Sequence, residues 1–197
     1  MLTRVAVAVS GRGSNLQALL DSLSAEAPAR VVLVISNRAD AGALERARAR
    51  GIATSVLRDP AQASEWLPVL EAAGVDLLVL AGYLKLVPPE VVRRYQGRII
   101  NIHPALLPAF GGPGMYGARV HRAVLASGVK ESGATVHLVD EVYDRGSILG
   151  QARVPVLPGD TTESLASRVL EVEHQLLPAA VLAAARAGKP VPFTSEG

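Results

Sequence analysis

The sequence predicts an α/β fold with two different halves. The N-terminal half is Rossmann-like, an open, mostly parallel twisted sheet with helices on both faces, and the C-terminal half adds antiparallel strands. Short apolar runs alternate with helical patterns through the first hundred residues, and parallel neighbouring strands need such crossovers. Beyond residue 103 the alternation stops, and a Pro- and Gly-rich loop leads to one helix and two successive strand-like runs.

The N-terminal half is expected to hold buried strands with helices between them. The first strand, Val5 to Val9, is followed by a glycine-rich turn and a helical pattern of leucines. Gly51 is expected to end the second helix, because glycine is favoured just beyond a helix C-terminus. The expected strands are 5–9, 31–35, 52–57, 76–80 and a run that ends at 103, and the expected helices are one beginning near 16, then 43–50 and 63–73.

The C-terminal half is expected to end in a long helix. Asp160, with Glu163 three residues later, resembles a capping box at the start of this helix. Pro178 is expected to kink or divide it, because proline lacks the N–H that a helix interior needs. The expected elements of this half are a helix at 119–126, strands at 135–140 and 148–154, and the helix from 161 to 187.

The composition indicates one compact domain. Hydrophobic residues make up 49% of the 197 residues and charged residues 19%, which is typical of a chain with a buried core. Lys and Arg number 20 against 18 Asp and Glu, without a basic cluster that would predict nucleic-acid binding. Cysteine is absent, which excludes disulfides and thiolate chemistry. No signal peptide or membrane-spanning segment is recognised, so we expect a cytoplasmic protein that does not bind membranes.

Asn101 and His103 point most directly to chemistry. Side chains two apart in a strand share a face, so an amide donor and a titratable imidazole are expected to project together from a strand's C-terminal end. Ligands collect at such ends in open α/β sheets. Asp144, in an acidic loop farther along the chain, offers a carboxylate that would orient or charge the imidazole. The three side chains together predict acyl-transfer chemistry.

Two other features each have two interpretations. The glycine loop Ser10–Asn15 stands where a strand hands over to a helix, so it is either an anion site or a tight turn whose polar residues serve the helix start. In the acidic loop, Asp140 and Glu141 are ordinary solvated residues, whereas Asp144 could be turned inward.

We expect no metal site, because no HExxH or EF-hand spacing is present. His137 is interpreted as structural, since it alternates with apolar neighbours in a strand.

Five motifs, taken in order, are similar to phosphoribosylglycinamide formyltransferases over nearly the whole chain. The motifs lie at 10–17, 35–37, 81–83, 101–108 and 140–151. The resemblance implies that the chain moves a formyl group from 10-formyltetrahydrofolate to the amine of glycinamide ribonucleotide in purine biosynthesis, a step of one-carbon metabolism. It implies one domain over 1–197, with a nucleotide-binding half at 1–100 and a folate-binding and catalytic half at 101–197.

The resemblance also assigns roles to residues. His103 would be the proton donor and acceptor, Asn101 would donate to the developing oxyanion, and Asp144 would raise the pKa of His103. The implied nucleotide contacts are Gly13, Ser14, Asn15 and Glu173. The implied folate contacts are Leu84, Lys85, Leu86, Val87, Asn101, Asp140, Glu141, Val142, Tyr143 and Asp144. The implied partners are these two small molecules alone, with no metal, and relatives occur as monomers or homodimers.

The chain also departs from the resemblance. Position 170 is Leu where some members place a Lys near the phosphate, and Arg168 is the residue we expect to supply that charge. The long loop from Phe110 to Gly117 is expected to be a mobile cover over the nucleotide. Ser147 stands where the family usually has Pro, beside Asp144.

There are three alternative functions, two of them enzymatic and one without catalysis. A formyltetrahydrofolate hydrolase would pass the formyl group to water, but such enzymes usually carry an N-terminal regulatory domain, which we do not expect because the first strand starts within a few residues of Met1. Methionyl-tRNA formyltransferases lack the glycine loop at 10–15 and usually add a nucleic-acid-binding domain. A binding module without catalysis is the third alternative, and the intact Asn101, His103 and Asp144 disfavour it.

Overall fold

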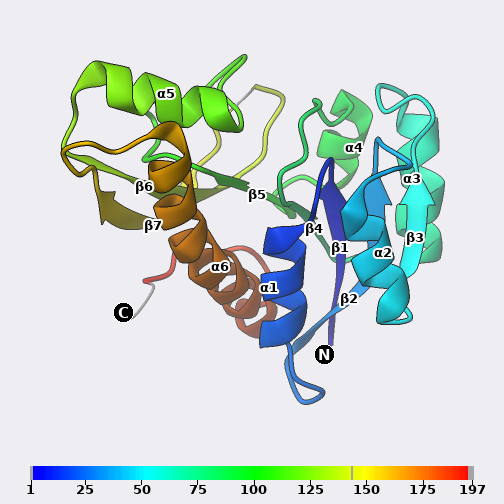
Figure 1. Cartoon of the computed structure of the whole chain (residues 1–197). Coiled ribbons are helices and arrows are strands. Elements are labelled where there is room, and N and C mark those ends of the chain that lie inside the picture. Colours follow the sequence, from blue (N-terminus) through cyan, green and yellow to red (C-terminus); the bar gives the residue numbers. More distant parts are fainter. Residues whose placement is uncertain (1, 143, 195–197) are drawn as a thin grey trace.

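One seven-stranded sheet forms the centre of the molecule (Figure 1), which is known from a computed structural model that describes residues 2–142 and 144–194. The strands are β1 (Thr3–Val9), β2 (Ala29–Ser36), β3 (Ala53–Val56), β4 (Leu77–Leu80), β5 (Ile99–His103), β6 (Glu131–Leu138) and β7 (Ile148–Pro155). The helices are α1 (Ser14–Ser22), α2 (Gly42–Ala49), α3 (Ala63–Ala72), α4 (Pro89–Arg94), α5 (Ala118–Ser127) and α6 (Thr162–Ala187).

The strand order is β3-β2-β1-β4-β5-β6-β7. The first five strands run parallel, whereas β6 pairs antiparallel with β5 and β7 pairs antiparallel with β6. The predicted fold class, with parallel strands first and antiparallel strands last, is therefore confirmed. The order of the strands reverses between β1 and β4, and the crevice at such a switch point is where open α/β sheets bind ligands.

Helices cover both faces of the sheet, and the side chains of β1 show why. Val5, Val7 and Val9 pack in a cluster that includes residues of α1, α2, α5 and α6. Ala6 and Ala8 pack in the opposite cluster, which contains residues of α3 and α4. A strand that is buried on both faces needs apolar residues at every position, and this accounts for the continuous apolar runs that predicted the strands.

The final helix differs from the prediction at two points. Its capping box joins Thr161 and Ser164, one residue later than the predicted Asp160 and Glu163: the Ser164 N–H donates to Thr161 Oγ1 over 3.2 Å and the Thr161 N–H donates to Ser164 Oγ over 2.9 Å. Of the two expected effects of Pro178, a kink or a division, the division is absent, because the helix continues to Ala187. Fully buried leucine and valine side chains before and after the proline hold it against the sheet.

One helix was not predicted. α4 is only six residues long, too short to show helical periodicity in the sequence. No helix within the described part of the chain is long and apolar enough to cross a membrane.

Candidate active site

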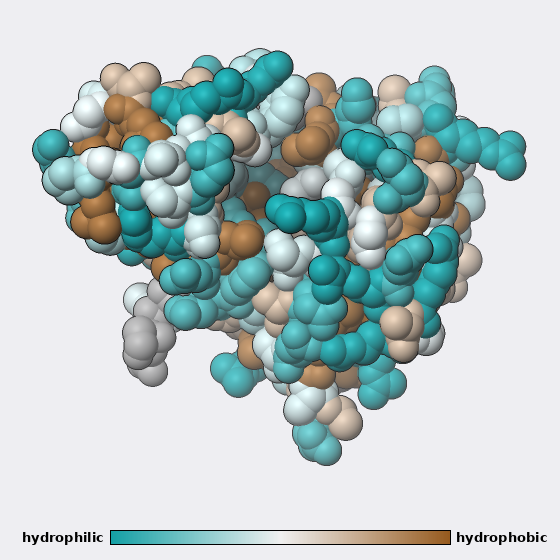
Figure 2. All heavy atoms as spheres, in the orientation of Figure 1, coloured by the Kyte–Doolittle hydropathy of each residue, from teal (hydrophilic) through white to brown (hydrophobic). Residues whose placement is uncertain are grey.

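A cavity of about 450 Å³ opens beside the ends of β4 and β5. Figure 2 shows a hollow in this face of the molecule, with hydrophobic side chains inside it, between the part that carries α5 and α6 and the part that carries α1 and α4. Both the size and the mostly apolar lining are those of a small-molecule site. The lining comes from Asn15 and from residues within 80–87, 101–104, 112–121, 137–144 and 162–173.

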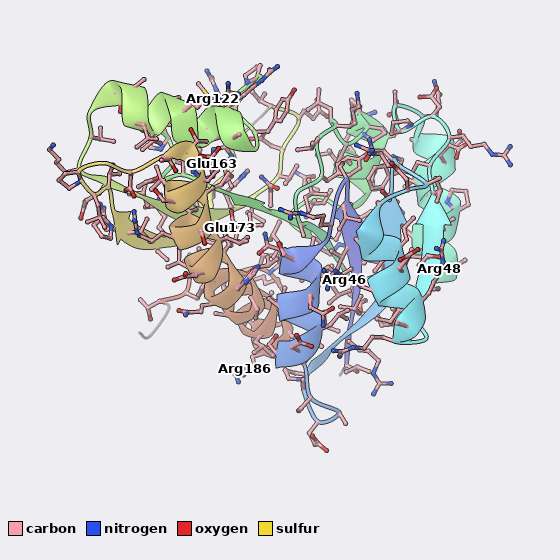
Figure 3. All side chains as sticks on the ribbon, viewed as in Figure 1. Arg46, Arg48, Arg122, Glu163, Glu173 and Arg186 are labelled. Atoms are coloured by element: carbon pink, nitrogen blue, oxygen red, sulfur yellow. The ribbon has the colours of Figure 1, made fainter. Side chains whose placement is uncertain are left out.

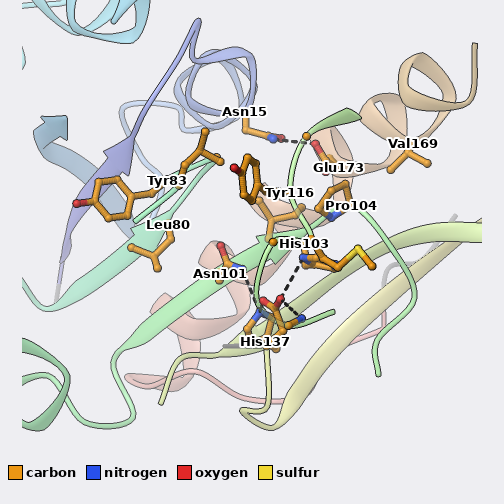
Figure 4. A pocket seen from close by; sticks show the side chains of 18 of the residues that line it. Asn15, Leu80, Tyr83, Asn101, His103, Pro104, Tyr116, His137, Val169 and Glu173 are labelled. Carbon is orange, nitrogen blue, oxygen red and sulfur yellow. Dashed lines mark hydrogen bonds and ion pairs between the residues drawn. The ribbon is translucent and has the colours of Figure 1, made fainter. Parts of the chain in front are cut away.

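Asn101 and His103 both line this cavity, as their spacing in the strand predicts (Figure 4). The antiparallel register of β5 and β6 places His137 directly opposite Asn101. Asn101 Nδ2 lies 3.0 Å from His137 Nε2. His137 Nδ1 lies 2.7 Å from the carbonyl oxygen of Leu138, which can only accept, so Nδ1 carries a proton, and the Asn101 amide donates to Nε2 when that nitrogen is unprotonated. His137 is therefore a member of the site that the sequence interpretation missed, because only strand pairing brings it there.

His103 is almost fully buried, with 4% of its side chain exposed. Its Nε2 lies 2.8 Å from the carbonyl oxygen of Phe110 and donates to it. Its Nδ1 lies 3.7 Å from Asp144 Oδ2. Burial lowers the pKa of His103 more than the Asp144 carboxylate raises it, so the pKa lies below its usual value. Asp144 does raise the pKa of His103, as the resemblance implies, but the net shift is downward because burial, which the sequence does not reveal, has the larger effect.

The side chain of Asp144 is turned into the cavity, as one of the two interpretations of the acidic loop predicted. It has a positive φ of 54°, and its Oδ2 accepts from the N–H of Gly112 over 2.9 Å. Its Oδ1 lies 3.4 Å from His137 Nε2, an ion pair when that ring is protonated. Burial raises the pKa of Asp144, but the contacts with His137, His103 and the Gly112 N–H outweigh it, so the pKa lies below its usual value.

A glycine two residues later lets the chain turn here. A Cβ added at Gly146 would lie 1.7 Å from the carbonyl oxygen of Leu138, so no other residue fits at this position without moving β6. The close approach of the backbone at position 146 to the backbone of Leu138 therefore requires a glycine in the sequence Asp144-Arg145-Gly146.

Asn15 and Glu173 form the second polar pair of the cavity (Figure 4). Asn15 Nδ2 donates to Glu173 Oε2 over 2.9 Å. Burial raises the pKa of Glu173 to about 7, although the hydrogen bond from Asn15 acts against this rise. Asn15 Oδ1 is buried and has no partner among the described residues. An unpaired buried acceptor is costly, so this oxygen is suited to a hydrogen-bond donor on a bound molecule.

Gly13 and Ser14, which the resemblance also implies as nucleotide contacts, stand beside the cavity lining rather than in it. Gly13 has a φ of 77°, and a Cβ added there would lie 2.5 Å from the Cβ of Ala43. The tight turn expected here is therefore present at Gly13, but no side chain caps α1, so the expectation that polar residues of the loop serve the helix start is wrong. Whether the loop binds an anion depends instead on the backbone N–H groups that follow this glycine at the start of α1.

The implied folate contacts are mostly, but not all, in the lining. All four residues of the segment 84–87 line the cavity, and so do Asp140 and Val142. Glu141 does not: its Oε1 lies 3.2 Å from Arg93 Nη1 in an exposed ion pair. Tyr143 lies outside the described residues. Among residues 2–142 and 144–194, no group of three or more His, Asp or Glu is arranged to hold a metal ion.

Arg168 is held away from the cavity. Its guanidinium forms two hydrogen bonds with Asp160, Nη1 to Oδ2 over 2.7 Å and Nη2 to Oδ1 over 2.9 Å. The pKa of Asp160 is strongly lowered by this hydrogen bond and by two others. The expectation that Arg168 supplies charge at a phosphate is therefore wrong, whereas Leu170 does line the cavity.

Comparison with known proteins decides the family. A sequence profile described as formyl transferase matches residues 3–181. The chain belongs to the formyl transferase family. Within it, a protein of Haemophilus influenzae named phosphoribosylglycinamide formyltransferase is 41% identical over 185 residues, covering 90% of this chain and 84% of that protein. A crystal structure of phosphoribosylglycinamide formyltransferase from Anaplasma phagocytophilum has a TM-score of 0.88 at 42% identity and covers 93% of this chain and 87% of that one.

Plant members of the family are longer. The chloroplastic phosphoribosylglycinamide formyltransferase of Arabidopsis thaliana is 49% identical over 181 residues, which cover 88% of this chain and 62% of the plant protein. The chain thus spans less than two thirds of that relative's length. It spans 58% of the corresponding protein of Vigna unguiculata.

Proposed function

We propose that the chain transfers the formyl group of 10-formyltetrahydrofolate to the amine of glycinamide ribonucleotide, as a step of purine biosynthesis. The observation that supports this most strongly is the convergence of Asn101, His103 and Asp144 on one cavity, in a chain whose relatives are named for this reaction. An amide donor, a titratable imidazole and a carboxylate are the groups that acyl transfer to an amine requires.

The two ends of the cavity suit the two small molecules. The end at Asn15 and Glu173 is polar and buried, which fits the hydroxyl and amine groups of a nucleotide. The other end is lined by Leu84, Leu86 and Val142, whose apolar side chains fit the flat rings of a folate. Both halves of the chain contribute to each end, since Glu173 joins Asn15 at one end and Val142 joins Leu84 and Leu86 at the other. The expected division into a nucleotide half at 1–100 and a folate half at 101–197 is therefore too simple, and we propose a single domain that binds both molecules.

The folate supplies the formyl group, and the residues of the chain move the proton. In the free protein His103 is neutral, and its Nε2–H is occupied by the Phe110 carbonyl. Its Nδ1 is therefore the nitrogen that would accept a proton from the attacking amine. The Asp144 carboxylate, 3.7 Å away, would stabilise the resulting imidazolium. The same proton would then pass to the departing nitrogen.

Asn101 is placed to act on the formyl oxygen. Its amide nitrogen has two hydrogens, and only one of them is used by His137 Nε2. The second hydrogen would donate to the oxygen as negative charge develops there. A preformed donor of this kind is typically worth a hundredfold or more in rate.

The test is formyl transfer from 10-formyltetrahydrofolate, followed by absorbance, with and without glycinamide ribonucleotide. We expect turnover only when the nucleotide is present. Turnover without the nucleotide would instead identify a hydrolase. A protein that binds both molecules but shows no turnover would be a binding module, and either result would reject the proposal.

A further inference from the structure

The segment 84–87 lines the cavity but belongs to no helix or strand. Its leucines are not held by burial, because Leu84 is 46% exposed and Leu86 is 50% exposed. Among the described residues, the backbone of this segment makes a single hydrogen bond: the N–H of Leu84 donates to Ser10 Oγ over 2.9 Å. A segment with so few contacts opens easily, so the order of this wall depends on the Ser10 hydroxyl.

Ser10 stands directly after β1 and is nearly fully buried, with 4% of its surface exposed. Besides accepting from Leu84, its hydroxyl donates to Asn37 Oδ1 over 2.6 Å. A hydroxyl has one hydrogen to donate, and the bond to Asn37 uses it, which fixes its orientation and turns a lone pair to the Leu84 N–H. The backbone N–H of Ser10 separately donates to the carbonyl oxygen of Gly82 over 3.1 Å.

Three of the five motifs that resemble the family meet at this hydroxyl. Ser10 belongs to the motif at 10–17, Asn37 belongs to the motif at 35–37, and Leu84 follows the motif at 81–83. Neither Ser10 nor Asn37 lines the cavity, so contact with a substrate does not account for them. Their place in the sheet does: β2, β1 and β4 are parallel neighbours, and their carboxyl ends meet at one edge.

The nucleotide end of the cavity is built from other elements. Asn15 lies at the start of α1, and Glu173 projects from α6 (Figure 3). These two side chains are hydrogen-bonded to each other, and within the described residues neither is bonded to Ser10 or to the segment 84–87. Loss of the Ser10 hydroxyl should therefore loosen the folate end and leave the nucleotide end in place.

We propose that the Ser10 hydroxyl, oriented by Asn37, is a positioning group that holds the segment 84–87 in the conformation that binds the folate. The inference rests on the proposed function, which assigns this segment to the folate. A wall that is ordered before the ligand arrives spares the complex the entropic cost of ordering it. The hydroxyl should therefore act on folate affinity rather than on the proton transfer at His103.

The test measures the binding of each small molecule separately. Ser10→Ala removes the hydroxyl and keeps the backbone bond to Gly82. The stable analogue 10-formyl-5,8-dideazafolate and glycinamide ribonucleotide are each titrated calorimetrically into the wild type and into this variant. We expect Ser10→Ala to weaken binding of the folate analogue roughly threefold to tenfold, the range expected for one lost hydrogen bond, and to leave binding of the nucleotide unchanged. In steady-state kinetics the KM for the folate should rise by more than kcat falls.

Ser36→Ala is the matched control. Ser36 is a fully buried serine at the end of the neighbouring strand β2, and its Oγ accepts one backbone N–H, that of Arg38, over 3.1 Å. Its hydroxyl has no bond to the segment 84–87. Ser36→Ala should bind both ligands as the wild type does.

Hydrogen exchange and a pair of Asn37 variants separate positioning from a general effect on stability. In Ser10→Ala, peptides that span 84–87 should exchange faster than in the wild type, whereas those of β1 and α6 should exchange at the wild-type rate. Asn37→Asp keeps an oxygen that accepts from the Ser10 hydroxyl, and Asn37→Ala does not. Asn37→Asp should therefore bind the folate analogue more tightly than Asn37→Ala.

Four results would overturn the inference. Wild-type affinity of Ser10→Ala for the folate analogue would show that the hydroxyl is not needed. Equal weakening of both ligands, or faster exchange throughout the chain, would make Ser10 a general stabiliser. The same loss of folate affinity in Ser36→Ala would remove the specific role of Ser10, and equal affinities of the two Asn37 variants would remove that of Asn37. Failure of the wild type to bind the folate analogue at all would instead reject the proposed function.

Discussion

Burial and charge act in opposite directions on His103. The carboxylate of Asp144 favours the imidazolium, but burial disfavours it more strongly, so the ring is neutral in the free protein at neutral pH. A neutral imidazole is ready to accept a proton. Once His103 is protonated, the Asp144 carboxylate stabilises the positive charge on the imidazolium. Asp144 is ionised because its own pKa is lowered.

Replacement of either residue should stop this proton transfer. We expect His103→Ala and Asp144→Asn each to lower the turnover number by roughly a hundredfold or more, because one removes the proton acceptor and the other removes the charge that stabilises it. Asparagine can still accept the Gly112 N–H through its Oδ1, so the fold should persist. Steady-state kinetics and circular dichroism measure the two effects, and wild-type turnover in both variants would contradict the assignment.

Glu173 should make stability depend on pH. Its folded pKa, about 7, is above the reference value of 4.5. A raised carboxyl pKa contributes stability that is complete below the unfolded pKa and is lost as the pH rises through the folded one. Glu173→Gln cannot ionise and keeps an acceptor for Asn15. Relative to the wild type, we therefore expect this variant to gain roughly 2 to 3 kcal/mol of unfolding free energy between pH 5 and pH 8.

Urea unfolding of both proteins at the two pH values measures this difference. The comparison cancels the titration of all other groups, since they are common to both proteins. A pH-independent difference between wild type and variant would show that Glu173 has an ordinary pKa.

At the scale of elements, the pairing of β5 with β6 builds the proposed catalytic centre. The register sets Asn101 opposite His137 and His103 opposite Thr135, and directly opposed residues of an antiparallel pair lie on one face. Thr135 Oγ1 donates to the carbonyl oxygen of Ala105 over 2.7 Å and accepts from the N–H of Leu107 over 3.0 Å. Thr135 thus connects β6 to the segment that follows β5.

The start of α6 depends on its capping box. Thr161→Ala removes the acceptor for the Ser164 N–H, and loss of such a cap costs about 1 kcal/mol of unfolding free energy. Ser167→Ala, at an exposed position inside the same helix, should leave stability unchanged or slightly higher, because alanine is the better helix former. Chemical denaturation of the two variants tests this, and equal stabilities would show that the cap contributes nothing.

At the scale of the whole molecule, the cavity lies where three parts of the chain meet. α1 supplies Asn15, β5 supplies Asn101 and His103, the β6–β7 loop supplies Asp144, and α6 supplies Glu173. Figure 1 shows α6 crossing the sheet beside α1, which brings the helix that carries Glu173 next to the helix that carries Asn15. Binding energy and chemistry therefore both depend on a complete fold.

The buried histidines should make the fold sensitive to acid. The pKa values of His103, His121 and His174 are all lowered, in each case with burial as the largest cause. A depressed folded pKa contributes stability that is present above the unfolded value, about 6.5 for histidine, and is lost as the pH falls through the folded value. We therefore expect Glu173→Gln, which lacks the opposing titration, to lose stability steadily from pH 7 to pH 5.

Adding His121→Leu to that variant should reduce the loss. His121 is buried and its Nδ1 has no partner among the described residues, so leucine removes a group that acid must charge. Urea unfolding across the pH range provides the measurement. An unchanged slope would show that His121 does not contribute.

The sequence by itself determined the order of the elements and most of the site. Continuous apolar runs predicted the doubly buried strands, and the two-residue spacing placed Asn101 and His103 on one face at the end of β5. These inferences succeeded because they depend on local patterns. Asp144 was also identified, although its inward turn depends on the close packing of Gly146 against Leu138.

Only the tertiary structure decided how these residues act on one another. It set His137 against Asn101 through strand pairing, lowered the pKa of His103 through burial, and engaged Arg168 with Asp160. None of these outcomes has a local signature, because each depends on the distance and solvent exposure of groups that the fold alone brings together.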